Sequence, residues 1–204
     1  TMTDPHITTL THGAASCRIH AFGATVLSFV SDDGRENLFL SRDAALDGSA
    51  PIRGGIPIAF PIFGPPGEHD GTMPQHGFAR RNFWKLERVA NEDVATTAVF
   101  SLALADATAG RGANNPWSAA QAALDGTDCR LEYEVRLESR QLTTTLVVKN
   151  TGTDAFNFNC LLHTYYAVEG GAALDAARTH IDGLGGYAIT DQLTGERDQR
   201  VQSY

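Results

Sequence analysis

Residues 51–84 read PIRGGIPIAFPIFGPPGEHDGTMPQHGFARRNFW, and proline and glycine recur along the whole stretch. This density of backbone breakers excludes a long helix or an uninterrupted strand. The stretch is therefore predicted to be a loop system pinned by short extended pieces, of which residues 56–60 (IPIAF) are the clearest. Loops stiffened in this way commonly serve to place side chains.

The side chains that this loop system offers are mostly basic or polar: Arg53, Gln75, His76, Arg80 and Arg81. A guanidinium group matches the oxygens of phosphate or carboxylate with two parallel hydrogen bonds. One arginine in a loop would be an ordinary solvated side chain. Separated arginines beside a Gln-His pair instead indicate an anionic, hydroxyl-rich ligand.

Short strands with turns between them flank the loop system on both sides. Residues 14–30 have the alternation of two strands, and residues 98–104 alternate as a half-buried strand would. Residues 131–137 and 142–148 form the clearest hairpin, whereas residues 105–116 are small and polar and are expected to be a loop. Because no 3.6-residue period is sustained, the pattern predicts an all-β sandwich with little helix.

A second stretch, residues 155–166 (AFNFNCLLHTYY), is predicted to be a strand with two unlike faces. The face expected to point into the core consists of Phe156, Phe158, Cys160 and Leu162. The other face consists of Asn157, Asn159, Leu161, His163 and Tyr165. A lone histidine on a strand is commonly just hydrogen-bonded structure. His163 shares its face with other ligand-type side chains, so it is a candidate for function.

Four motifs together resemble the hexose-6-phosphate mutarotases, or glucose-6-phosphate 1-epimerases, of the wider aldose 1-epimerase group. They are IRGGIP at 52–57, FPIFG at 60–64, QHGFAR at 75–80 and HTYY at 163–166. The resemblance covers most of the 204 residues. It implies a galactose-mutarotase-like β-sandwich (a supersandwich), with residues 1–204 forming a single domain that lacks its C-terminal part.

The resemblance also implies an activity, the interconversion of the α and β anomers of hexose 6-phosphates without a cofactor or metal. In this reaction an acid protonates the ring oxygen while a base takes the C1 hydroxyl proton. His163 matches the family's catalytic acid, and Arg53 and Arg80 match its phosphate-binding arginines. Gln75 matches a substrate-binding position, and His76 is expected to touch a ring hydroxyl.

The catalytic base of the resembling family is a glutamate that lies well beyond the HTYY segment. The acidic residues that follow His163 here lie in segments with the composition of turns or polar loops, and none matches the motif around that glutamate. We therefore expect the 204-residue chain to lack the general base.

The amino-acid composition indicates which classes of partner and which cellular compartment to expect. Sixteen basic against 24 acidic residues give a net charge of −8, which disfavours general binding to nucleic acid or to an anionic membrane. Three scattered cysteines without CxxC spacing disfavour a disulfide framework or a cysteine zinc site. No secretory signal or apolar span is apparent. We expect a cytoplasmic monomer with a small-molecule substrate.

Two alternative functions remain open at this point. One is a phosphosugar-binding sandwich without catalysis, which would keep the pocket but not the chemistry. The other is an epimerase of unphosphorylated aldoses. The paired arginines argue against the latter, because a neutral sugar offers them no anion.

Overall fold

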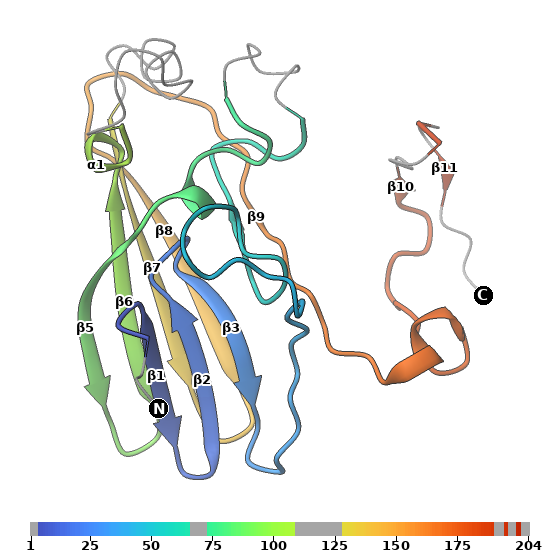
Figure 1. The fold of residues 1–204 in the computed structure, drawn as a ribbon. Coiled ribbons are helices and arrows are strands. Elements are labelled where there is room, and N and C mark those ends of the chain that lie inside the picture. The colour runs from blue at the N-terminus through green and yellow to red at the C-terminus, as the bar shows by residue number, and fades with distance from the viewer. Residues whose placement is uncertain (1–3, 66–72, 109–127, 190–193, 196–198, 201–204) are drawn as a thin grey trace. The chain divides into compact units, whose positions relative to one another are not determined.

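The computed structural model describes residues 4–65, 73–108, 128–189, 194–195 and 199–200 (Figure 1). The chain divides into two compact units, Thr1–Ala167 and Val168–Tyr204. The described part of the first unit contains two larger antiparallel sheets with the core between them, and a two-stranded sheet made of β4 (Ile58–Ala59) and β9 (Leu161–Leu162). In the second unit, the described elements are η3 (Gly170–Leu174) and a pair of two-residue strands.

The first sheet has three strands, in the order β1-β2-β3. They are β1 (Ile7–His12), β2 (Ala15–His20) and β3 (Thr25–Val30), each antiparallel to its neighbour. The prediction of strands within residues 14–30 is confirmed, and Cys17 and Ile19 of β2 are buried.

The second sheet has four strands, in the order β5-β6-β7-β8, and lies behind the first in the view of Figure 1. They are β5 (Lys85–Asn91), β6 (Thr96–Ala103), β7 (Cys129–Leu137) and β8 (Leu142–Asn150). The predicted hairpin is confirmed, because β7 and β8 pair along their full length. Two packed sheets make the fold the all-β sandwich that the sequence predicted, with little helix.

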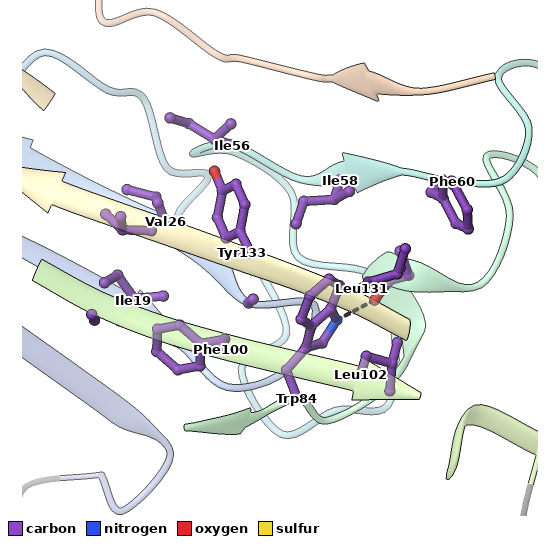
Figure 2. Close-up of a cluster of buried hydrophobic side chains, with 14 of the residues drawn as sticks. Ile19, Val26, Ile56, Ile58, Phe60, Trp84, Phe100, Leu102, Leu131 and Tyr133 are labelled. Carbon is purple, nitrogen blue, oxygen red and sulfur yellow. Dashed lines mark hydrogen bonds between the residues drawn. The ribbon is translucent and has the colours of Figure 1, made fainter. Parts of the chain in front are cut away.

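The core lies between the two sheets, where alternate side chains of each sheet face one another (Figure 2). Ile19 and Val26 come from the first sheet, and Phe100 and Tyr133 come from the second; all four are fully buried. Trp84 belongs to the same cluster, where its ring meets that of Tyr133 edge to face, and its indole Nε1–H donates a 2.8 Å hydrogen bond to a backbone carbonyl. Such a bond satisfies the one polar group that a buried tryptophan carries.

The predicted half-buried strand at residues 98–104 is wrong in its burial, because both faces of β6 are covered. Thr97, Val99 and Ser101 on its outer face are buried too, at 4–7% exposure. Long charged side chains of the neighbouring strands lie over this outer face. Glu87 of β5 accepts hydrogen bonds from Ser101 Oγ (2.6 Å) and from Arg130 of β7 (2.9 Å). Ion pairs and aliphatic stems thus shield small side chains that alternation alone would place in water.

The helical pieces are short, namely α1 (Leu104–Thr108), η2 (Ala79–Arg81) and η3. The expectation of a loop at residues 105–116 is therefore wrong at its start, where one helical turn follows β6 directly. The rest of that segment lies outside the described residues. None of the helices in the described part of the chain could cross a membrane.

The 155–166 segment is far less regular than predicted, since its only strand is β9 (Leu161–Leu162), paired with β4 (Ile58–Ala59). The antiparallel register of β4 and β9 nevertheless continues beyond both ends of the pair, where each step has a single hydrogen bond. The amide of Asn159 donates to the Pro61 carbonyl (2.8 Å), and that of His163 donates to the Pro57 carbonyl (2.9 Å). Proline has no N–H with which to return either bond, so the ladder is one-sided there.

The predicted inward face of this segment is wrong at two of its four positions. Phe156 and Leu162 do pack against the core, but Phe158 is 47% exposed and Cys160 is exposed as well. The residues before Leu161 are not in a strand, so the two-residue alternation of a strand does not apply to the first half of the segment.

In the second unit, the two-residue strands β10 (Ala188–Ile189) and β11 (Gln199–Arg200) pair antiparallel. Large apolar side chains of this unit, such as Ile181 at 81% and Tyr187 at 64%, are exposed. Among its described residues, Ala172 is buried.

Candidate active site

Two glycines let the proline-rich loops cross other parts of the backbone closely. Gly55 has φ +64°, and a Cβ there would lie 1.9 Å from the Val26 carbonyl oxygen. Gly77 has φ +70°, and a Cβ there would lie 2.1 Å from the Phe60 carbonyl oxygen. Neither position has room for a side chain, so the glycines of IRGGIP and QHGFAR hold the loop system together.

His76 is held in an uncommon backbone conformation, with φ +63°. Its Nδ1 accepts a 3.0 Å hydrogen bond from the Gly64 amide, which places the proton of the neutral ring on Nε2. Phe63 stacks on the ring, with centroids 5.0 Å apart and planes 22° apart. A non-glycine residue at positive φ is a form of strain that clusters at functional sites.

The charge state of His76 follows from its surroundings. Burial lowers its pKa from 6.5 to about 4, helped by the positive charges of Arg80, His163 and Arg53, in that order. His76 is thus neutral near pH 7. Combined with its fixed tautomer, this makes Nε2–H a permanent hydrogen-bond donor rather than a group that cycles a proton.

Arg80 lies in η2 and is only 7% exposed. Its Nη2 donates to the Gln75 carbonyl at 2.7 Å, while its buried Nε has no hydrogen-bond partner among the described residues. Burial lowers the pKa of Arg80 to about 10, with further lowering from Arg81 and Arg53. A buried cation beside two like charges is costly unless an anion compensates it, so the arrangement favours an anionic ligand.

His163 is the residue directly after β9, and its side chain meets this cluster through His76. Its ring meets that of His76 edge to face, with centroids 5.7 Å apart. Its other neighbour is Tyr165, whose ring stacks on it at 4.9 Å with planes 19° apart. The two histidines come from segments almost ninety residues apart, and the ladder opposite Pro57 brings them together.

The structure brings together four of the five side chains that the sequence singled out: Arg53, His76, Arg80 and His163. Gln75 lies beside them, but it contributes its backbone carbonyl to Arg80, and its side chain is exposed. Among the residues that the structure describes, no group of three His, Cys, Asp or Glu side chains could hold a metal ion.

Sequence reasoning missed the stacking partner Phe63 and the Gly64 amide. No periodic signal could have found either, because a loop, not a strand, brings them to His76. Tyr165 was placed on the same strand face as His163, and the two-residue spacing between them does indicate that their rings are neighbours.

A comparison with protein families matches residues 6–203 to the aldose 1-epimerase model. The chain belongs to the aldose 1-epimerase family. A relative from Cenchrus ciliaris, provisionally named glucose-6-phosphate 1-epimerase, is 31% identical over 191 residues, covering 89% of this chain and 51% of its own length. An Escherichia coli K12 protein of the same provisional name is 27% identical over 163 residues, covering 80% of this chain and 47% of its own.

Solved structures support the same assignment of the fold. A provisionally named mutarotase, YeaD of Salmonella typhimurium, aligns with a TM-score of 0.61 and 25% identity, over 79% of this chain and 48% of its own. A galactose mutarotase-like protein of Lactobacillus casei aligns with a TM-score of 0.52 and 20% identity, over 76% of this chain and 47% of its own. The sandwich is therefore galactose-mutarotase-like. The chain spans about half the length of the curated relatives it matches.

Proposed function

We propose that this chain belongs to an enzyme that interconverts the α and β anomers of hexose 6-phosphates. The observation that carries the proposal is the buried Arg80, which lies with Arg53 and Arg81 beside two histidines. Family membership supports anomer exchange as the reaction class. The provisional names of the relatives support the phosphorylated substrate.

In the proposed reaction the arginines hold the 6-phosphate and thereby fix the sugar against the histidines. His163 donates a proton to the ring oxygen while a base removes the proton of the C1 hydroxyl. The bond between C1 and the ring oxygen breaks, and C1 becomes an aldehyde that rotates. Reclosure returns both protons, so the products differ from the reactants only in configuration at C1. His76 donates from Nε2 to a sugar hydroxyl.

The identity of the base stays a prediction. The charges that act on His76 and Arg80 are those of arginines, of His163 and of Tyr165. A carboxylate is the expected base, as the sequence resemblance implied, and among the described residues none acts on these two side chains. This observation favours a second candidate function, namely binding of phosphosugar without rapid exchange.

One experiment separates these functions. Anomer exchange of glucose 6-phosphate is measured by NMR, and binding is measured by calorimetry, on the wild-type chain and on His163→Asn. If the wild type exchanges the anomers, we expect the variant to bind as the wild type does but to exchange about 10²-fold more slowly, the usual contribution of a positioned acid. His180→Asn, a change at an exposed histidine, is the matched control. Binding without exchange in the wild type would support the second candidate, and equal exchange in all three proteins would refute the role of His163.

A further inference from the structure

Each histidine of the site has its own aromatic ring stacked against it. Phe63 stacks on His76, and Tyr165 stacks on His163, with interplanar angles of 22° and 19°. Because the two histidines also meet edge to face, Phe63, His76, His163 and Tyr165 form a continuous row, here called the four-ring array.

The His163 ring depends on this array for its orientation. Among the described residues, no hydrogen bond to its imidazole nitrogens is formed, whereas His76 is oriented by the Gly64 amide. Histidines that act in chemistry are commonly oriented by a hydrogen bond to one ring nitrogen. For His163 the contacts that serve this purpose are the rings of His76 and Tyr165.

Tyr165 is well fixed for such a task, because both of its backbone polar groups are paired. Its amide donates to the Gly55 carbonyl at 2.8 Å, and its carbonyl accepts from the Phe39 amide at 2.9 Å. Gly55 in turn donates to the Phe39 carbonyl at 2.7 Å, which closes a ring of three hydrogen bonds. Tyr165 also lies close enough to Arg80 to affect its electrostatics, so one side chain adjoins both the histidine and the arginines.

We propose that Tyr165 is the positioning residue of His163, and that its ring, rather than its hydroxyl, holds the imidazole in the plane that proton transfer requires. The catalytic part of this proposal rests on the proposed function, whereas the orientation of the ring does not. A stacked neighbour restricts rotation of the imidazole without altering its hydrogen-bonding capacity. Proton transfer then benefits because small misplacements of a catalytic group are costly in rate.

The test compares Tyr165→Phe, which keeps the ring, with Tyr165→Leu, which removes it. Tyr166→Leu is the matched control, because Tyr166 is 73% exposed and is the next residue of the same segment. The first readout is the NMR shift of the His163 ring protons, assigned with His163→Asn, which reports on the stacked ring directly. The second is kcat and KM for glucose 6-phosphate, with thermal unfolding to confirm that each variant is folded.

We expect Tyr165→Leu to move the His163 signals and to lower kcat about tenfold, with KM within about twofold of wild type. Tyr165→Phe and Tyr166→Leu should retain both wild-type properties. Wild-type signals in Tyr165→Leu would overturn the proposal, as would a Tyr165→Phe variant as impaired as Tyr165→Leu. If the wild-type chain binds glucose 6-phosphate without accelerating exchange, the second candidate function is supported, and the NMR signals still decide whether Tyr165 orients His163.

Discussion

The neutral state of His76 should make the protein lose stability in mild acid through this one residue. The pKa of His76 is about 4 in the folded chain, against an ordinary value of 6.5. Between these values the unfolded chain binds a proton at residue 76 and the folded chain does not. The contribution of the neutral His76 ring to the free energy of unfolding is therefore fully present above pH 6.5. It is lost progressively as the pH falls toward 4.

The difference between the two values is about 2.5 pKa units, and about 1.36 kcal/mol per unit gives an upper limit of roughly 3.4 kcal/mol. His76 is only partly buried, so solvent screening reduces this figure. We expect about 1–2 kcal/mol of acid-sensitive stability to depend on His76. Burial is the largest contribution, and the neighbouring arginines add to it.

The variant that tests this is His76→Asn, because asparagine tolerates the positive φ of this position better than other non-titrating residues. Urea unfolding of wild type and variant is measured at pH 7.5, 5.5 and 4.5. The other acid-sensitive groups, such as the buried His20, are present in both proteins and cancel in the difference. We expect the wild type to lose about 1–2 kcal/mol more than the variant between the highest and lowest pH. Equal losses would refute the reasoning.

Three further changes test the fold and the site. Gly77→Ala should destabilise the protein by several kcal/mol more than Gly34→Ala in urea unfolding. A Cβ at residue 77 would lie 2.1 Å from a backbone carbonyl oxygen, whereas a Cβ at residue 34 would have nothing within 4 Å. Similar losses of stability in the two variants would contradict this prediction. Arg53→Ala and Arg80→Ala should each weaken glucose 6-phosphate binding roughly tenfold to a hundredfold in calorimetry, with glucose binding little changed; equal losses for the two sugars would mean that phosphate is not their ligand. Trp84→Phe should cost about 1–3 kcal/mol in thermal or urea unfolding, because the carbonyl that accepts the indole hydrogen bond is left buried and unpaired; an unchanged stability would show that water replaces it.

Sequence patterns predicted several residues of the site but not how they come together. Arg53 and Arg80 were found by their residue type and spacing in a loop that could be neither helix nor strand, and His163 by its polar strand face. Their convergence was implied by the resemblance alone, because it depends on a non-local pairing, β4 with β9. The one-sided hydrogen bonds at Pro57 and Pro61 explain why the strand around His163 is shorter than its alternation predicts.

The sequence by itself determined the all-β class, the hairpin β7–β8 and the basic character of the loop system, because strand alternation, turn residues and charge are local properties. Only the tertiary structure decided that both faces of β6 are buried, that His76 is a neutral donor with its proton on Nε2, and that Phe63 and Tyr165 stack on the two histidines. Burial, pKa and ring stacking depend on which distant segments pack together. Such contacts are set by the packing of the whole unit, and no window of the sequence contains them.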